Sequence, residues 1–487
     1  MPSANSCPCH AIAHGDASWR SAKGQCSRCL PAFLWLYLSF TLIRPVLAAM
    51  PPEHRPELDR IGHIIVVLLE NRSFDQLYGM FPGADGIQNT GFAGIQVSSE
   101  GGQFETLPAV INNTAVWPGG PQPNLIGIDT RFPPGLANGP FRADQYIRLD
   151  ERTGDLVHRF YQEQQQIDDG RMDRFVAFSG AGALPMGYYD GSALPLFKLA
   201  TEYTLADRFF HAAFGGAFLN HFWLICACTP RFEDPPPSLI AKFDQEGTMT
   251  ADGAVTPDGY AVNTLEPISP PHSPDMPDRL RLPLQTMRTI GRSLTDAGVS
   301  WAWYAGGYAD AFGGHPDRTF IYHHQPFMYF GDYADGTAGR AEHLKDERDM
   351  IRAIRDRTLP AVSFYKPIGF NNEHRGYADI VRGDDHVAAI VHEIQNSFIW
   401  DDAVIIVTYA ENGGIWDHVA PPRIDRWGPG TRVPAIIISP FAKRHFLDHT
   451  TYDTTSILKL IEVRWQLTPL GDRDAKASDL TNALQLH

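Results

Sequence analysis

Cysteine is scarce in this chain of 487 residues. Four of its six cysteines lie within the first 48 residues, namely Cys7, Cys9, Cys26 and Cys29. Their spacings are those of half a zinc site, but no second pair or suitably spaced histidines accompany them. The other two, Cys226 and Cys228, are too close for an unstrained bridge in an extended segment. The composition therefore excludes a fold that is stapled by disulfides.

Positive charge is also in short supply. Lysine and arginine number 41 against 56 aspartates and glutamates, which gives a formal net charge of −15. No run of the chain is rich in lysine and arginine. Because nucleic acids and anionic membranes are bound mainly by basic patches, this balance argues against both partners. A small anionic substrate remains compatible with it, since a bound metal ion can reverse the local sign of charge.

Long apolar runs are missing except near the amino terminus. Residues 30–43 form such a run, with Arg20, Lys23 and Arg28 before it and the small-residue stretch 46–48 after it. This order is typical of a secretory signal peptide, and the run is short for a membrane span. We expect a leader over residues 1–48, export to the periplasm or beyond the cell, and no stable membrane span afterwards. The unusual length of the leader also leaves a retained anchor open.

Four continuous apolar runs predict strands that are buried on both faces, as in a parallel sheet. They cover residues 63–69, 359–365, 403–409 and 432–439. Apolar residues at helical spacing predict helices between and after these runs, over residues 194–203, residues 386–397 and the segment that follows Asp453. Strands that alternate with helices indicate a layered α/β fold.

Two polar pairs follow predicted strands, and each begins with an acid. Glu70-Asn71 follows the first run, and Glu411-Asn412 lies just beyond the third. Either pair alone could be a helix cap or a turn. Because sites in such sheets form beyond the carboxyl ends of strands, the two together favour a shared cation site. Residues 92–142 and 229–284, rich in Gly, Pro and Asn, are expected to be loop excursions that shape its mouth.

An ordered set of motifs runs through the chain: Glu70-Asn-Arg-Ser-Phe-Asp75, His158-Arg-Phe-Tyr-Gln162, Gly215-Gly-Ala-Phe-Leu-Asn-His221, Tyr322-His-His-Gln325, Gly383-Asp-Asp-His386, Glu411-Asn-Gly-Gly-Ile-Trp-Asp-His418 and Arg432-Val-Pro434. Together they resemble the phosphoesterase family of bacterial acid phosphatases and phospholipases C, and most closely its acid phosphatase branch. The resemblance covers nearly all of residues 49–487. It implies an α/β, alkaline-phosphatase-like layered fold, with a mixed, mostly parallel sheet and helices on both faces.

The resemblance also implies a site for one divalent metal ion and no other cofactor. Its ligand positions are Glu70, Asn71, Glu411 and Ala410, and its nucleophile position is Ala217. His158, His323, His324 and His386 match the histidines that steady phosphoryl oxygens and protonate the leaving group. A lone histidine is seldom a catalyst, so only the motifs support these four. Asp417-His418 is more readily interpreted as structural, and Trp117, Trp301 and Trp303 as core.

Two positions depart from the family pattern. Ala217 stands where the family has a hydroxyl residue, and Ala410 stands where it has an aspartate. An alanine side chain can neither attack phosphorus nor bind a metal, and loss of a nucleophile typically costs about a million-fold in rate. We therefore expect a phosphomonoesterase scaffold that is inactive or severely impaired.

Three accounts of the alanines remain open: an engineered inactive variant, which the intact histidines favour, a natural phosphate-binding pseudo-enzyme, or slow hydrolysis by metal-activated water. Phospholipase C activity is the alternative within the family. That subgroup often carries further β-domains after the position where this chain stops, which favours a phosphomonoester or another small phosphate compound as the ligand.

Overall fold

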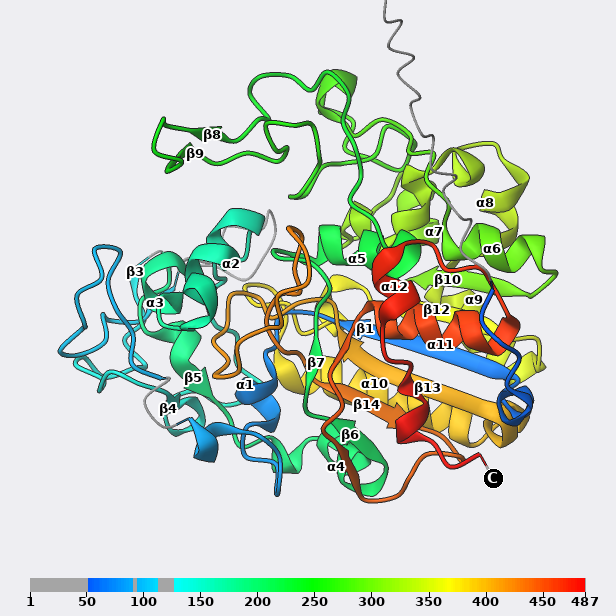
Figure 1. The fold of residues 1–487 in the computed structure, drawn as a ribbon, viewed down its shortest axis with the longest axis horizontal. Helices are drawn as coiled ribbons and strands as arrows, with labels where there is room; N and C mark the ends of the chain where they lie inside the picture. Colours follow the sequence, from blue (N-terminus) through cyan, green and yellow to red (C-terminus); the bar gives the residue numbers. More distant parts are fainter. Residues whose placement is uncertain (1–50, 91–93, 113–126, 487) are drawn as a thin grey trace, which may run out of the picture. The chain divides into compact units, whose positions relative to one another are not determined.

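The computed structural model describes residues 51–90, 94–112 and 127–486. The leader expected over residues 1–48, together with Trp117, lies outside this range. The centre of the described part is an eight-stranded sheet, in the order β11-β10-β12-β1-β13-β14-β6-β15 (Figure 1). Its strands are β1 (His63–Leu69), β6 (Thr204–Ala206), β10 (Trp301–Ala305), β11 (Leu344–Asp346), β12 (Val362–Lys366), β13 (Ala403–Tyr409), β14 (Ala435–Ile438) and β15 (Phe446–Asp448).

The sheet is mixed and mostly parallel, as expected. Strands β11, β10, β12, β1 and β13 run parallel to one another, β14 is antiparallel to both its neighbours, and β15 is parallel to β6. In the middle, Val66 lies opposite Phe364 on one side and Ile406 on the other. All three side chains are fully buried, which is why these strands are apolar without alternation.

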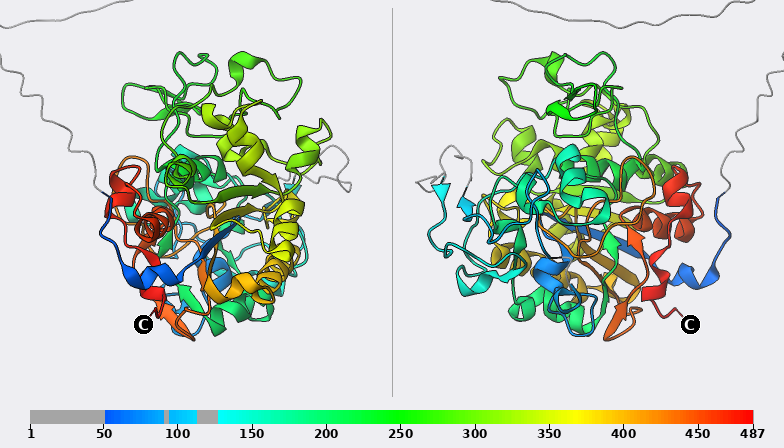
Figure 2. Two further views of the ribbon diagram at one scale, coloured as in Figure 1. Left: turned by 90° about the vertical axis from the view of Figure 1, so that its right-hand side faces the viewer. Right: turned by 60° about the vertical axis from the view of Figure 1, so that its left-hand side comes forward.

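Helices cover both faces of the sheet (Figure 2). One face carries α4 (Pro195–Glu202), α9 (Glu347–Asp356) and α10 (Ile380–Gln395), and the other carries α5 (Ala217–Cys226), α6 (Ile290–Asp296) and α11 (Thr455–Trp465). Helix α9 buries Met350 and Ile354, which lie one turn apart, and Asp346 begins it with a capping box. Every residue of α5 is buried, so this helix is part of the core.

The strands expected from the sequence at residues 63–69 and 403–409 coincide with β1 and β13. The run at 359–365 begins pairing only at Val362, because a proline at 360 cannot donate to a ladder. Helix α10 starts earlier than its apolar spacing indicated, at Ile380, where the Asp379 carboxylate accepts from the Arg382 N–H. Trp301 and Trp303 are buried in β10, which confirms their assignment to the core.

The excursion over residues 229–284 holds only the short pair β8 (Lys242–Phe243) and β9 (Met249–Ala251) and a 3-10 turn at Asp278–Leu280. It extends from the layered core on the side of α5 (Figure 1). In the described part of residues 92–142, regular structure is limited to β2 (Ile111–Asn112), β3 (Gly127–Ile128) and β4 (Phe141–Arg142).

The expectation that Cys226 and Cys228 cannot be bridged is wrong. The structure joins them by a disulfide with a Cα–Cα distance of 5.1 Å. The segment is not extended: Cys226 ends α5, and Ala227 adopts the left-handed conformation (φ 47°, ψ 37°), which brings its neighbours together. Among the described helices, none has the length and apolar character needed to cross a membrane.

Candidate functional site

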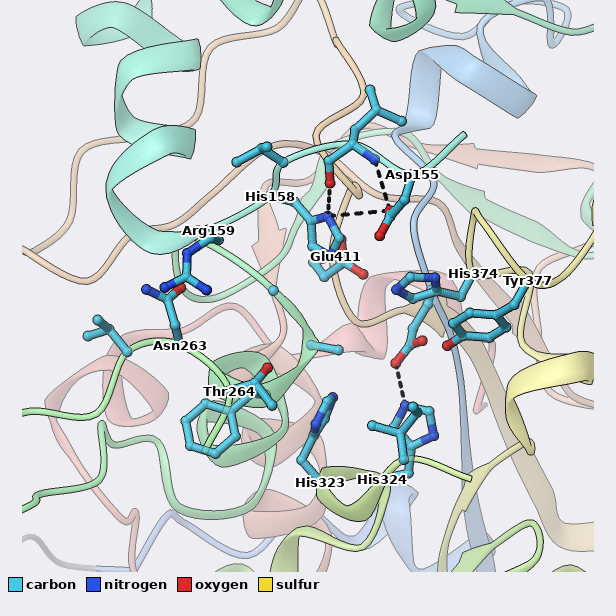
Figure 3. A pocket seen from close by; sticks show the side chains of 18 residues that line it. Asp155, His158, Arg159, Asn263, Thr264, His323, His324, His374, Tyr377 and Glu411 are labelled. Carbon is cyan, nitrogen blue, oxygen red and sulfur yellow. Dashed lines mark hydrogen bonds and ion pairs between the residues drawn. The ribbon is translucent and has the colours of Figure 1, made fainter. Parts of the chain in front are cut away.

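A cavity of about 410 Å³ lies beyond the carboxyl ends of β1, β12 and β13 (Figure 3). Its wall combines acids, histidines and the start of α5, and residues 262–264 of the long excursion form part of it. The residues that line it are Glu70, Asp155, Leu156, Val157, His158, Arg159, Gly216, Ala217, Phe218, Val262, Asn263, Thr264, Ile321, His323, His324, His374, Tyr377 and Glu411. Part of the 229–284 excursion thus lines this cavity, whereas no described residue of the 92–142 excursion does.

Glu70 is the first residue after β1, and its carboxylate is buried. One oxygen, Oε2, accepts a hydrogen bond of 2.7 Å from Asn372. The other, Oε1, lies 2.8 Å from Lys366 Nζ and 2.9 Å from His324 Nε2. Burial opposes ionisation of Glu70, but the Lys366 ammonium and His324 outweigh it and hold the pKa well below its ordinary value. The site therefore keeps a buried negative charge.

Glu411 is held by main-chain and amide donors. Its Oε1 accepts from the Asn71 N–H at 3.2 Å and from Asn71 Nδ2 at 2.7 Å, and Oε2 accepts from the Gly413 N–H. Gly413 has φ +63°, and a Cβ there would lie 2.5 Å from the Asn71 Cβ, so this turn requires glycine. Glu70 and Glu411 both line the cavity.

The structure does not place Asn71 in the cavity wall. Its amide oxygen accepts from the Arg375 N–H at 3.0 Å, and its amide nitrogen supports Glu411. Ala410 is also buried; its N–H donates to Leu69 O at 2.9 Å and so extends the pairing of β13 with β1. Metal-ligand roles for positions 71 and 410 remain predictions.

Helix α5 opens onto the cavity at its amino terminus. Gly216 and Ala217 both line the cavity, and no side chain caps the helix. The tight approach depends on Gly215, which has φ +91° and where a Cβ would lie 2.8 Å from the Phe160 N. Its N–H donates to buried Glu163. The free N–H groups of a first helical turn attract anions, so this end of α5 suits a phosphate oxygen.

His323 and His324 belong to a 3-10 turn, Tyr322–His324, beside Glu70. Burial lowers the pKa of both histidines. For His323 the pKa falls well below its ordinary value, and the neighbouring His324 contributes to that shift. Both are therefore neutral near pH 7. At His158, burial also opposes protonation, but Glu411 and Asp155 outweigh it and raise the pKa. His158 is thus the better candidate for a proton donor.

His386 does not line this cavity. It lies on α10, where its Nε2 is 2.6 Å from the Tyr365 hydroxyl and 3.3 Å from Glu347 Oε1. The structure instead brings in His374, which the sequence reasoning missed. His374 follows β12 in the polar stretch 371–374, so the strand-end argument that identified Glu70 could have found it. Lys366, at the end of β12, was missed because a buried lysine gives no signal in a single sequence.

Asp417 and His418 form a buried network away from the cavity wall. Asp417 accepts from Arg432 Nε at 2.8 Å, and His418 Nδ1 lies 2.7 Å from Asp75 Oδ2. Arg432 NH2 also lies 3.1 Å from Asp75 Oδ1. The arginine fills the space between the acids, in keeping with the structural role expected for Asp417 and His418.

The described residues offer two groups of metal-ligand type in this cavity. Donor atoms of Glu70, His323 and His324 lie within 4.8 Å of one another, and so do those of Asp155, His158 and His374. Glu70 Oε1 lies against Lys366 Nζ and His324 Nε2, and the carboxylates of Glu70 and Glu411 supply the oxygen ligands that a hard divalent cation prefers. The donors present therefore suit a divalent metal ion.

Comparison with known proteins agrees with this chemistry. The profile of the Phosphoesterase family matches residues 61–468. Phospholipase C B of Mycobacterium tuberculosis is 25% identical over 461 residues, which cover 87% of this chain and 78% of that protein. A non-hemolytic phospholipase C of Burkholderia pseudomallei is 22% identical, over 91% of this chain and 61% of its own length.

Two solved structures show a weaker likeness. An alkaline phosphatase superfamily protein from Vibrio parahaemolyticus has a TM-score of 0.32 at 10% identity, covering 66% of this chain and 72% of its own. Murine ectonucleotide pyrophosphatase/phosphodiesterase 5, in an inactive form in complex with AMP, has a TM-score of 0.33 at 8% identity, over 60% of this chain and 94% of its own.

Proposed function

The chain belongs to the phosphoesterase family, and from this premise we propose that its cavity binds a phosphomonoester of a small molecule. The scaffold is that of a metal-dependent phosphomonoester hydrolase of acid phosphatase type. With Ala217 at the nucleophile position and Ala410 at a ligand position, turnover is absent or severely impaired. The observation that carries the proposal is the uncapped start of α5, which shares one cavity with three carboxylates and four histidines.

The charges in the cavity support a cation there. Glu70 and Glu411 are two carboxylates, and Lys366 supplies one ammonium beside them. Their sum is negative, which by itself repels a phosphate group. A divalent cation held by Glu70 and Glu411, with His323 and His324 close by, would reverse that sign and lower the pKa of an attacking hydroxyl.

The chain's own groups account for binding and proton transfer. The N–H groups at the start of α5 bind a phosphate oxygen, and neutral His323 donates one hydrogen bond to another. His324 Nε2 lies 2.9 Å from Glu70 Oε1 and so orients that carboxylate. His158, with its raised pKa, holds a proton near the cavity wall and delivers it to the leaving oxygen. The group missing from this set is the one that attacks, because the Ala217 side chain is a methyl group.

Phospholipase C activity is the second candidate, because the curated relatives named above are phospholipases C. The two activities differ in the leaving group and in the charge of the phosphate, which is a diester in phospholipids. A third candidate from another class is a pseudo-enzyme that binds phosphate compounds without turnover, and the two alanines fit it equally well.

The test begins with the unaltered chain and p-nitrophenyl phosphate, p-nitrophenyl phosphorylcholine and inorganic phosphate, each with Mg²⁺, Mn²⁺ or Zn²⁺. We expect metal-dependent binding of phosphate by calorimetry and no release of nitrophenol above background. Turnover near an ordinary enzyme rate of about 10 per second would refute the proposed impairment. Absence of phosphate binding with every metal would refute the ligand class.

Export to the periplasm or the medium belongs to the same proposal. It is supported by the basic, apolar and small-residue order of residues 20–48. Amino-terminal sequencing of exported material should give a mature chain that begins near Ala49. A chain that keeps Met1 in the cytosol would contradict it.

A further inference from the structure

Three arginines gather around the half-buried ring of Phe370. The guanidinium carbons of Arg318, Arg382 and Arg152 lie 4.9, 5.2 and 6.0 Å from the centroid of that ring. Arg318 and Arg382 are exposed, and Arg152 is partly exposed. Because the chain as a whole carries a formal net charge of −15, this cluster is a local exception to its charge balance.

Two of these guanidiniums have unused hydrogen-bond donors. Within the described residues, the Arg152 guanidinium makes no hydrogen bond and no ion pair, and its contact is the Phe370 ring. The Arg382 guanidinium donates through Nε to Asn371 Oδ1 at 2.9 Å. A guanidinium that lies against an aromatic ring keeps the N–H donors at its edge available to an anion.

The acids nearest to the cluster in sequence have other partners. Asp379 accepts the main-chain N–H of Arg382 and so caps α10. Asp317 accepts hydrogen bonds within its own turn, and Glu151 lies 3.6 Å from Arg131 Nη1. These acids therefore do not neutralise the Arg382 guanidinium by pairing with it.

The cluster lies beside the cavity. Phe370 belongs to the 3-10 turn Gly369–Asn371, which follows β12 at the same edge of the sheet. This turn packs against Tyr377, because a Cβ at Gly369 would lie 2.9 Å from Tyr377 Cε2. Tyr377 lines the cavity next to His374 (Figure 3).

The same loops build the cavity wall and the cluster. Arg152 lies three residues before Asp155, and Arg318 lies three residues before Ile321. Asp155 and Ile321 both line the cavity. A ligand that fills the cavity and extends past Tyr377 therefore reaches the side of the arginines.

We propose that Arg152, Arg318 and Arg382 bind a second phosphate group of the substrate, which is then a small molecule with two phosphates. Arginine binds phosphate oxygens through paired N–H groups, and its charge does not depend on pH in the physiological range. A compact soluble ligand is favoured over an anionic membrane, which the net charge of the chain repels. The proposal rests on the proposed function, since the first phosphate occupies the cavity.

The experiment measures binding to the full chain by calorimetry with Mg²⁺, Mn²⁺ or Zn²⁺ present. Alkanediol bisphosphates of increasing chain length are compared with alkyl monophosphates of the same length. We expect the bisphosphate of matching length to bind about tenfold more tightly than its monophosphate, as charge-assisted hydrogen bonds allow. This ratio of affinities should fall as salt is added, because exposed charges are screened.

The double variant Arg152→Gln, Arg382→Gln should bring the ratio close to one. General damage to the cavity would weaken both ligands and leave the ratio unchanged, so the ratio separates the two causes. Arg357→Gln is the matched control and should keep the ratio. Arg357 also lies over an aromatic ring, 3.5 Å from the Phe398 centroid, but it precedes β12 and so lies at the opposite edge of the sheet.

The outcomes distinguish this proposal from the proposed function. If inorganic phosphate binds but the ratio is near one at every length, or survives the double variant, the subsite is refuted and the proposed function stands. If inorganic phosphate does not bind, the proposed function is refuted. Bisphosphate binding that still depends on Arg152 and Arg382 would then support the cluster as an anion site, and its absence would refute both. If the double variant does not fold, as judged by circular dichroism, Arg382→Gln alone replaces it.

A lipid headgroup is the other source of a phosphate group. Phosphatidylcholine vesicles with and without phosphatidic acid test it by co-sedimentation with the chain. Binding that requires phosphatidic acid and is lost in the double variant, together with a bisphosphate ratio near one, would assign the cluster to a membrane and overturn the small-molecule ligand. No binding to either vesicle, with the expected ratio, supports the proposal.

Discussion

Two buried clusters of acids lie at the same edge of the sheet, and different groups neutralise their charges. In the first, Asp75 and Asp417 are both paired with Arg432. Arg432 Nη1 also donates to two backbone carbonyls, Asp85 O at 2.8 Å and Asp207 O at 2.7 Å. The arginine thereby satisfies the whole cluster. In the second, the Glu70 carboxylate lies against Lys366 and His324 and also lines the cavity, so no arginine closes this cluster. Nearby, both ring nitrogens of His221 make no hydrogen bond within the described residues.

The same residue types therefore serve two purposes. In the closed cluster of Asp75 and Asp417, the arginine and nearby groups occupy the carboxylate oxygens, so none is left to bind a ligand, and the cluster holds loops together. In the open cluster around Glu70, the acids line a cavity and can bind an ion and a substrate. Residue type alone does not separate the two, because Asp417-His418 looks catalytic by composition, although it was expected to be structural. The following predictions break one cluster or the other.

The largest effect, on the rate of hydrolysis, is expected when the missing nucleophile and metal ligand are restored to the open cluster. The double variant Ala217→Ser, Ala410→Asp should hydrolyse p-nitrophenyl phosphate faster than the unaltered chain by up to about a million-fold, because the nucleophile acts as a unit with the metal site. Ala217→Ser alone should regain part of this rate, more so at high metal concentration. Ala410→Asp alone should gain metal affinity but little turnover.

The four combinations are compared by phosphate release across a metal titration. The effects should be non-additive, with the double variant far above the sum of the single ones. A double variant that binds metal and phosphate yet stays inactive would show that the nucleophile position has been assigned wrongly.

Breaking the closed cluster should cost stability. Arg432→Met removes the counter-charge of buried Asp417 and leaves Asp75 with His418 as its partner, so the free energy of unfolding should fall by about 3–5 kcal/mol. Urea denaturation followed by circular dichroism measures it. Arg426→Met is the matched control: Arg426 pairs with Asp258 at 2.8 Å, but both side chains are about half exposed. It should lose at most about 1 kcal/mol, and an equal loss in both variants would contradict the distinction.

Substitution of His374 or His386 should have a smaller effect; the sequence predicted His386 as a site residue, whereas the structure places His374 in the cavity. His374→Ala should weaken the binding of inorganic phosphate, measured by calorimetry with metal present, by roughly tenfold, because it removes a ring that lines the cavity and packs against His158. His386→Ala should leave it unchanged, because His386 lies on α10 against Tyr365 and Glu347. A reversed order would restore the assignment that the motif suggested.

These histidines also show how far the sequence reasoning extended. Strands β1 and β13 and the acids that follow them could be predicted, because a continuous apolar run and an acid at its end are local signals. The convergence of Lys366 with Glu70 could not, because a buried lysine gives no local signal and its position depends on β12 lying next to β1 in the sheet. His374 follows β12 and was within reach of the strand-end argument. His386 was chosen from its neighbours in sequence, and such neighbours do not determine which side of the sheet a residue occupies.

The bridge between Cys226 and Cys228 was missed for a related reason. A spacing of two residues prevents an unstrained disulfide only in an extended chain, whereas Cys226 is the last residue of a helix and Ala227 has a left-handed conformation. A helix end is the feature that single-sequence reasoning places least well, because several residues can end a helix with nearly equal free energy. Strand β10 was missed because its tryptophans and alanines, over Trp301–Ala305, were assigned only to the core and not to an element.

A third buried acid, Glu462 on α11, sharpens the comparison because it has neither an arginine nor a cavity. Its side chain is fully buried and both oxygens lack a hydrogen-bond partner among the described residues. Burial, with nearby Asp474 adding to it, raises the pKa of Glu462 to about 9.

A carboxyl group whose pKa is raised in the folded state stabilises the fold below its unfolded pKa, and this contribution is lost as the pH rises towards the folded value. The neutral variant Glu462→Gln should therefore match the parent near pH 4.5 and become more stable than it by several kcal/mol at pH 8, since each pH unit between the two pKa values contributes about 1.4 kcal/mol. Glu393→Gln on α10, where the glutamate lies in an exposed pair with Arg355, is the control and should show no such trend. The free energy of unfolding is measured in urea at several pH values between 4.5 and 8.5. If the difference between Glu462→Gln and the parent does not change with pH, Glu462 is ionised in the folded protein, and a buried acid without an arginine then has a counter-charge that the described contacts do not include.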